Sequence, residues 1–369
     1  MTQRTSLATF RRSIPALALS LALFACSDDK NNGGNNDKIE GNSLLLNFTR
    51  NRDTGELRWM HPDSANLSNG ALAFEQDSRV SVAKENIFVL SNLTGAPGTL
   101  ACILPQDIGD ESKIMQNTLT GANPYEAAVI GSKGYIALYE KNYVEVFNVS
   151  TCAPSEKIDL PTLEEDAPAN ASTIKASGDT LLLTLQRLEN WAATKPGLLV
   201  RINAKTKTLI DTIQLKLYNP SASVLSNGKL YVSAQSRYNA DYSYDYTKSG
   251  VEVVDLKTKN SEVLATGEQL GGGAYSIALD EANQILYVST SASWGSSPVK
   301  PVNLATKSVG NTLPDILDAS DLIFDKEGKK LFVAEKSGLK VYNPATKKTT
   351  TIGNQDELLP PSSLAIVNF

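Results

Sequence analysis

Residues 226–233 read Ser-Asn-Gly-Lys-Leu-Tyr-Val-Ser, and residues 250–258 read Gly-Val-Glu-Val-Val-Asp-Leu-Lys-Thr. Turn-forming residues lead in each case into a short run of β-branched, leucine or aromatic residues, which is the pattern of a β-strand. Asn227 and Gly228 suit a tight turn because both tolerate a positive φ angle. The stretch therefore predicts four strands in one antiparallel unit, at residues 221–225, 229–234, 250–256 and 261–265.

The turn that ends the second segment recurs along the chain. The pattern [Asn/Asp]-x-x-Thr begins at Asn148, Asn203, Asp255, Asn303 and Asn343, at intervals of 55, 52, 48 and 40 residues. An Asn or Asp side chain at the first position of a turn can accept hydrogen bonds from backbone N–H groups further along it. We therefore interpret this repeated pattern as structural turns rather than as a binding site.

A repeated unit of this length with four antiparallel strands is typical of an all-β β-propeller. Six units run from about Arg79 to Gly353. We predict seven four-stranded blades, because the C-terminal segment and three N-terminal segments also have strand patterns, at residues 363–369, 43–48, 56–60 and 71–74. Pairing the N- and C-terminal strands would close the ring and remove open sheet edges. The alternative is six blades with the N-terminal strands as a separate cap.

The unit at residues 226–258 resembles the repeat of YVTN-type, YncE-like seven-bladed propellers. The resemblance covers roughly residues 79–353 and is strongest in the last three units. It implies an exported propeller and transfers no catalytic residue to this chain, and that family is itself functionally mixed.

The N-terminal segment indicates export. Residues 1–25 have a positively charged start, with Arg4, Arg11 and Arg12, and then an apolar stretch too short to span a bilayer. They end in Leu-Phe-Ala before Cys26, which resembles a bacterial lipobox in which Cys26 becomes the lipid-modified N-terminus. We predict a lipoprotein signal peptide at 1–25, a disordered tether at 26–42 and the propeller at 43–369.

The residues after Cys26 and the net charge indicate where the protein acts. Ser27-Asp28-Asp29 resembles the surface-export signal of some outer-membrane lipoproteins, so we expect lipid anchoring in the outer membrane, exposed at the cell surface. The formal charge is −5, and loss of the three arginines of the signal peptide makes it −8. Without a basic block, nucleic acid is not an expected partner. We expect a monomer.

The cysteine count and the single histidine limit the chemistry. Cys102 and Cys152 remain after Cys26 is assigned to lipidation, so an exported protein could join them in one disulfide. His61 alone cannot build a multi-histidine metal site, and no nucleophile motif accompanies it. We predict no catalytic residue, no metal and no cofactor.

The loops between the second and third strands of successive units differ in length and composition. In the third, fourth and fifth blades they carry Trp and Tyr residues, which are common interface anchors, and such loops share one face of a propeller. The candidate ligand-binding residues on this rim are Trp191, Arg237, Tyr238, Tyr242, Tyr244, Tyr246 and Trp294.

The favoured function is a lipid-anchored binding module that holds a glycan, peptide or protein on the rim of blades 3–5. One alternative is a scaffold in envelope assembly. The other is an enzyme of unidentified mechanism, which would need a pair of acidic groups such as Glu189, Asp241 or Asp245, or carboxylates deep in the central channel.

Overall fold

The computed structural model describes residues 41, 43–51, 54–92, 97–121, 123–160, 169–189, 192–235, 237–238, 244–353 and 359–369. These ranges belong to the unit that spans residues 37–369. The predicted signal peptide, Cys26 and nearly all of the predicted tether lie outside them. Within the described ranges, none of the helices has the length and apolar character needed to cross a membrane.

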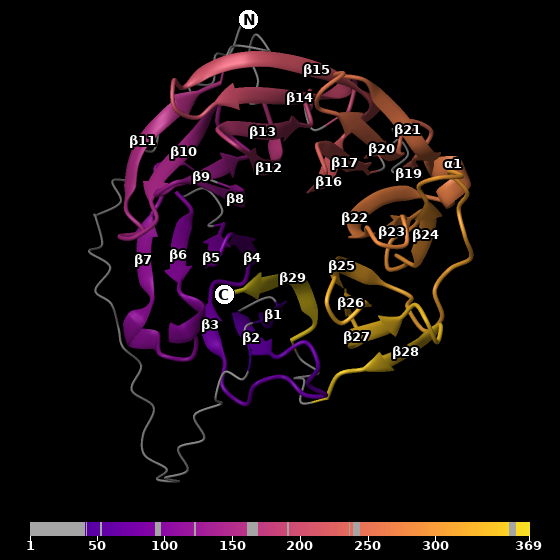
Figure 1. Cartoon of the computed structure of the whole chain (residues 1–369), viewed down its shortest axis with the longest axis horizontal. Coiled ribbons are helices and arrows are strands. Elements are labelled where there is room, and N and C mark those ends of the chain that lie inside the picture. The colour runs from indigo at the N-terminus through magenta and orange to yellow at the C-terminus, as the bar shows by residue number, and fades with distance from the viewer. Residues whose placement is uncertain are drawn as a thin grey trace, which may run out of the picture. The chain divides into compact units, whose positions relative to one another are not determined.

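The unit is an all-β propeller of seven antiparallel blades arranged in a ring (Figure 1). The innermost strands line a central channel. Blades 1 to 3 have four strands each, in chain order from the channel outward. Blade 1 contains β4 (Ser78–Ala83), β5 (Asn86–Ser91), β6 (Thr99–Ile103) and β7 (Met115–Thr118). Blade 2 contains β8 (Pro124–Ile130), β9 (Lys133–Leu138), β10 (Tyr143–Asn148) and β11 (Pro154–Asp159). Blade 3 contains β12 (Ala171–Ser177), β13 (Thr180–Leu185), β14 (Pro196–Asn203) and β15 (Thr208–Tyr218).

Blades 4 to 6 continue the series. Blade 4 contains β16 (Pro220–Ser226), β17 (Lys229–Ala234), β20 (Gly250–Asp255) and β21 (Ser261–Thr266), within a residue of the predicted bounds. Blade 5 contains β22 (Gly273–Asp280), β23 (Ile285–Ser291) and β24 (Val299–Asn303). Blade 6 contains β25 (Ala319–Asp325), β26 (Lys330–Glu335), β27 (Gly338–Asn343) and β28 (Lys348–Thr351). Short elements between strands are η1 (Pro105–Asp107), η2 (Glu111–Lys113), α1 (Gly267–Leu270) and the hairpin of β18 (Arg237–Tyr238) and β19 (Tyr244–Asp245).

The seventh blade joins the two ends of the described chain. Its order is β29 (Pro361–Asn368), β1 (Ser43–Arg50), β2 (Gly55–Met60) and β3 (Leu72–Phe74). β29 is the innermost strand and pairs with β1 in an antiparallel register from Ser43 opposite Asn368 to Thr49 opposite Pro361. The predicted closure by terminal strands is confirmed, and the six-blade alternative is wrong.

Blade 5 differs from the predicted four strands in detail. In place of a fourth strand next to β24, blade 5 has a single bridge between Val302 and Val309. The N–H groups of Gly310 and Leu313 still donate to carbonyls of β24, at 2.8 Å each. Pro301 within β24 has no N–H to offer, so a regular ladder cannot form on this edge. The irregular segment nevertheless covers the edge that a missing strand would leave open.

The repeated [Asn/Asp]-x-x-Thr turns have the predicted hydrogen bonds. In each of the five copies, the side-chain Oδ1 accepts from the backbone N–H groups two and three residues on, at 2.8–3.3 Å. The residue after the Thr then adopts a left-handed conformation, with φ between 56° and 62°, at Cys152, Lys207, Lys259, Lys307 and Lys347. These Asx side chains are therefore part of the folding pattern, as expected.

The residue in this left-handed position often links neighbouring blades at their outer edge. Lys207, Lys259 and Lys307 form ion pairs with Glu156, Asp211 and Glu262, which lie on the outermost strand of the preceding blade. In blade 2 the same position is Cys152, and it forms a disulfide with Cys102 of blade 1, with Cα atoms 5.8 Å apart. A covalent bond thus replaces the ion pair at the first blade boundary.

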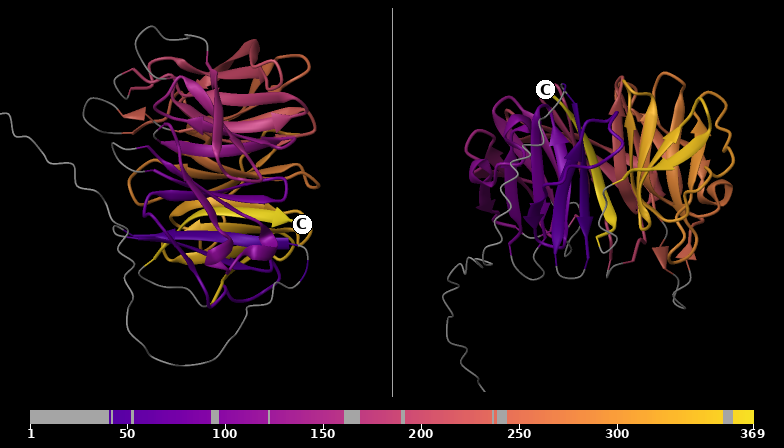
Figure 2. Two further views of the ribbon diagram at one scale, coloured as in Figure 1. Left: turned by 90° about the vertical axis from the view of Figure 1, so that its left-hand side faces the viewer. Right: turned by 90° about the horizontal axis from the view of Figure 1, so that it is seen from below.

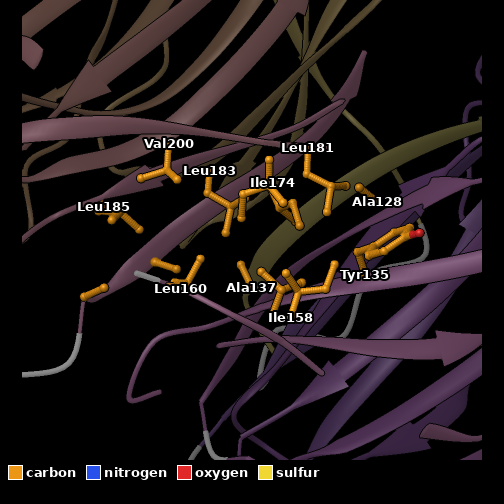
Figure 3. Close-up of a cluster of buried hydrophobic side chains, with 14 of the residues drawn as sticks. Ala128, Tyr135, Ala137, Ile158, Leu160, Ile174, Leu181, Leu183, Leu185 and Val200 are labelled. Atoms are coloured by element: carbon orange, nitrogen blue, oxygen red, sulfur yellow. The ribbon is translucent and has the colours of Figure 1, made fainter. Parts of the chain in front are cut away.

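The blades pack against one another through apolar side chains that alternate along each strand. Figure 3 shows the cluster between blades 2 and 3, where leucines of β13 lie against Ala137 and Ile158. Leu181, Leu183 and Leu185 are completely buried there. Burial of each such side chain contributes about 1.5–3 kcal/mol, so these interfaces supply most of the favourable free energy of folding.

The innermost strands pair by backbone only within their own blades, so side chains connect them across the blade boundaries. We call these residues the inner ring: Ser81, Glu126, Thr173, Ser221, Ser223, Ser276, Asp321 and Ser363. Ser81 accepts from Ala127 N–H at 3.2 Å, Glu126 from Ile174 N–H at 2.8 Å, and Ser223 donates to Thr173 at 2.8 Å. Ser221 donates to the Tyr275 carbonyl at 2.8 Å, Asp321 accepts from Ser276 and from Leu364 N–H, and Ser363 accepts from Val80 N–H at 3.3 Å. All seven boundaries are bridged in this way.

Removing the disulfide should destabilise the propeller without changing its fold. Because the bond closes a loop with a sequence separation of 50 residues, a Cys102→Ser, Cys152→Ser double variant should lose about 3–4 kcal/mol of unfolding free energy by the chain-entropy account. Urea denaturation of the variant and of the oxidised wild type measures this difference. Equal unfolding midpoints would contradict the expectation.

Candidate functional site

The loops that join the second and third strands of each blade lie on one face of the disc, together with the linkers between blades. We call this the loop face and define it by residues 186–189, 192–195, 235, 246–249, 292–298 and 317–318. Figure 2 shows the disc from the side, with strands running from this face to the opposite one. Ser43 and Asn368 are paired at the other ends of the strands, so the chain enters the propeller on the face opposite the loop face.

Trp294 is the most prominent side chain of the loop face. It lies at the tip of a tight turn closed by a bridge between Ser293 and Ser296, and Gly295 beside it has φ +72°, a conformation that glycine adopts without strain. Its side chain is 90% exposed. The turn therefore holds a large aromatic ring in solvent.

A second exposed apolar side chain lies on the segment paired with this loop. Ser297 forms a parallel bridge with Asp318, and its N–H donates to the Leu317 carbonyl at 2.8 Å. Leu317 is 72% exposed. Serine hydroxyls at positions 291, 293, 296 and 297 surround the turn in sequence. Blade 5 thus combines an open indole ring, an aliphatic side chain and several hydroxyl groups on the loop face.

Arg237 and Asp245 hold the blade 4 loop in place. The Arg237 Nε donates to Asp245 Oδ2 at 2.5 Å, across the β18–β19 hairpin. The Thr247 hydroxyl also donates to Asp245, and these two contacts, with Thr247 the larger, lower the pKa of the carboxyl. Arg237 further donates to the Ala193 carbonyl of the blade 3 loop at 3.4 Å. Arg237 is thus engaged in loop structure, and its side chain is still 36% exposed.

The other predicted rim residues have different outcomes. Trp191, Tyr242 and Asp241 lie outside the described residues. Tyr238 is described only through its backbone, which pairs with Tyr244. Tyr244 and Tyr246 are half-buried. The structure thus brings the loops of blades 3 and 4 together through Arg237, and it places Trp294 on the loop of the next blade.

The central channel is a second candidate site, which the sequence analysis did not identify by residue. It encloses about 390 Å³ and is lined by the innermost strands of all seven blades. Its charged lining residues are Arg79, Glu126, Lys175, Asp321 and Lys326. Polar residues interrupt the otherwise apolar innermost strands, and this was the sequence signal that could have indicated the channel site. Their spacing does not distinguish them from ordinary polar residues at the protein surface.

The two channel carboxylates serve the blade boundaries. Glu126 accepts from Ile174 N–H and forms an ion pair with Lys175. Asp321 accepts from the Ser276 hydroxyl at 2.7 Å and from the N–H groups of Leu322 and Leu364, at 2.9 and 2.8 Å. Asp321 as a residue is half-buried because one side lines the channel, yet its carboxylate lies between strands, and this burial raises its pKa. Each carboxylate is thus committed to neighbouring strands.

The acidic residues considered for catalysis in the loops are also engaged. Glu189 accepts from the Thr194 hydroxyl and forms an ion pair with Lys195 at 2.6 Å. Asp245 is held by Arg237 and Thr247, as described above. In the described part of the chain, no group of three or more His, Cys, Asp or Glu residues could hold a metal ion.

Comparison with known proteins gives the fold. No family model and no curated protein matches the chain. Among solved structures, it is similar to apo AztD from Citrobacter koseri (10% identity, TM-score 0.55, 88% of this chain and 98% of that one). It is also similar to a candidate 6-phosphogluconolactonase from Bacteroides fragilis (15%, 0.56, 89% and 99%) and to the periplasmic gluconolactonase PpgL of Pseudomonas aeruginosa (13%, 0.56, 88% and 99%). At these identities the likeness establishes a shared fold, the seven-bladed β-propeller.

Replacing Asp321 should test its structural role in the channel. Asp321→Ala leaves the Leu364 N–H and the Ser276 hydroxyl without their acceptor, whereas the Leu322 N–H keeps Ser276 Oγ at 3.1 Å. Each unsatisfied group costs roughly 1 kcal/mol or more. We expect a loss of about 2 kcal/mol in unfolding free energy, with a smaller loss in Asp321→Asn, which keeps one acceptor oxygen. Chemical denaturation measures both variants. Wild-type stability in Asp321→Ala would show that these hydrogen bonds do not hold the blades.

Proposed function

We propose that this chain is a lipid-anchored, YncE-like propeller of the outer membrane that binds a glycan on its loop face. The observation that carries the proposal is the Trp294 ring, 90% exposed at the tip of a closed turn. Large aromatic side chains that are accessible on a surface are frequent binding anchors.

The surroundings of Trp294 favour a carbohydrate over an apolar peptide. A flat aromatic face stacks on the C–H face of a sugar ring, while nearby hydroxyl groups can exchange hydrogen bonds with sugar hydroxyls. The turn supplies both, since serines flank Trp294 at positions 293 and 296. Leu317 on the paired segment adds apolar surface to the same area.

The proposed anchor and the proposed binding surface lie in different parts of the chain. Ser43 enters the propeller on the face opposite the loop face. Acylation at Cys26 would attach the chain to the membrane through the segment that precedes Ser43 in the sequence. The lipobox-like residues before Cys26 and the acidic residues after it support this anchoring, and the resemblance of the repeat to YncE-like propellers supports export.

Replacing Trp294 should weaken glycan binding and leave the fold intact. We expect Trp294→Ala to reduce affinity for glycans bound by the wild type on a glycan array by at least about fivefold, since an anchor contributes more than about 1 kcal/mol. Its melting temperature should match the wild type because the side chain buries little surface. Ile210→Ala is the matched control: it removes an apolar side chain that is 46% exposed on β15, at the outer edge of blade 3.

The array has three informative outcomes. Loss of binding in Trp294→Ala alone supports the proposal. Equal binding by Trp294→Ala and the wild type, or equal loss in Ile210→Ala, contradicts it. An array without signal, combined with Trp294-dependent binding of a peptide or protein, would replace the glycan by a polypeptide partner.

Anchoring predicts a separate result. A Cys26→Ala variant cannot be acylated, so it should leave the membrane fraction and appear in the soluble envelope fraction, with the propeller still folded. Fractionation of cells followed by immunoblotting measures this distribution. Finding the wild-type protein in the soluble fraction would overturn the lipoprotein assignment.

A further inference from the structure

Arg79 lines the channel from β4 and differs from the other charged residues there. Glu126 and Lys175 form an ion pair, Asp321 accepts three hydrogen bonds, and Lys326 pairs with Glu281. By contrast, no hydrogen bond or ion pair joins the Arg79 guanidinium to another residue within the described ranges. The channel therefore contains a half-buried cation whose N–H donors are not used by the fold.

The guanidinium is nevertheless held in place. Its Cζ lies 4.2 Å from the centroid of the Tyr125 ring, and Tyr125 stacks on Tyr139 with centroids 4.9 Å apart. Tyr125 occupies a β-bulge between Pro124 and Glu126 of β8, a feature that commonly redirects a side chain next to a functional site. The Tyr125 ring, supported by Tyr139, therefore stabilises the Arg79 guanidinium at the channel wall.

The support continues into blades 3 and 4. The buried Tyr139 hydroxyl donates to Gln186 Oε1 at 2.8 Å, and Gln186 Nε2 donates to the Pro220 carbonyl at 2.9 Å. Burial raises the pKa of Tyr139, so its hydroxyl stays protonated and remains a donor. A planar guanidinium with free donors matches the geometry of a carboxylate or phosphate group.

The rest of the channel determines the kind of anion. Hydroxyl groups from blades 3 and 4 line it, at Ser172, Thr173, Ser221 and Ser223. Each is used in the protein's own hydrogen bonds, but a hydroxyl that donates still has lone pairs that can accept. The volume of about 390 Å³ lies within the range of small-molecule sites.

We propose that the channel binds a small hydroxylated oxyanion, a carboxylate or a phosphate, through the Arg79 guanidinium stacked on Tyr125. This site is distinct from the glycan surface around Trp294, because it lies on the innermost strands and uses charge rather than an exposed aromatic ring. Either site can be occupied without the other.

Titration calorimetry at low ionic strength tests the proposal with three probes. D-galacturonate supplies a carboxylate, and inorganic phosphate supplies a phosphate group. D-galactose is the uncharged counterpart of D-galacturonate. We expect millimolar or tighter binding of at least one anionic probe, no measurable binding of galactose, and at least a tenfold weaker interaction in Arg79→Gln. Binding of only one anionic probe identifies the carboxylate or the phosphate as the recognised group.

Arg50→Gln is the matched control, because it makes the same change of charge at a residue paired with Asp77 at the end of β1. It should bind like the wild type. Arg79→Lys keeps the charge without the planar fork, so its affinity should fall between wild type and Arg79→Gln, and it serves if Arg79→Gln fails to fold. The proposal is overturned if neither anionic probe binds below about 10 mM, if Arg79 variants bind like the wild type, or if Arg50→Gln weakens binding equally. None of these results bears on the glycan array with Trp294→Ala.

Discussion

The innermost strands of the seven blades converge on the channel, but their backbones pair only within each blade. Side chains must therefore satisfy the polar groups at every boundary and fix the blades around the ring. The inner ring does this with hydroxyls and two carboxylates, and the pairing of β29 with β1 makes the last boundary equivalent to the others. Most polar residues of the channel lining are consequently engaged in joining the blades into a closed ring. Only residues that are not needed for this closure are available to bind a ligand.

This constraint separates the polar residues of the channel into two groups. Asp321 and Glu126 look like a pair of catalytic acids in the lining, yet their partners are the neighbouring strands. Arg79 lies in the same channel, but its contacts are aromatic rings and its donors stay open. A half-buried guanidinium that lies over an aromatic ring, and makes no hydrogen bond within the described residues, keeps its N–H donors available to a ligand.

The propeller could be predicted because its repeat is local. Each [Asn/Asp]-x-x-Thr turn depends on a side chain and backbone groups within three residues, so the sequence pattern and its physical cause coincide. The closing blade followed from strand patterns at the two ends. The reduced fourth strand of blade 5 could not be predicted in this way. Pro301 disrupts the hydrogen-bond ladder because of its position in the strand register, which the sequence alone does not show.

The sites were less predictable because they depend on residues far apart in the chain. The Arg79–Tyr125–Tyr139 stack joins blades 1 and 2, and nothing near Arg79 in sequence indicates its aromatic partner. On the loop face, sequence could not distinguish Arg237, which holds its loop through Asp245, from Trp294, which is open to solvent. In each case, contacts across a hairpin or a blade boundary determine whether the side chain takes part in the protein's own hydrogen bonds and ion pairs.

Hydrogen exchange on a chain that ends at Pro360, and so lacks β29, would test closure most directly. If the inner ring and the β29–β1 pairing make the blades one cooperative unit, amide protection should fall together in β1, in the flanking strands β25 and β4, and in the blades beyond them. Exchange confined to β1, β2 and β3, with wild-type protection in blades 2 to 5, would contradict this account.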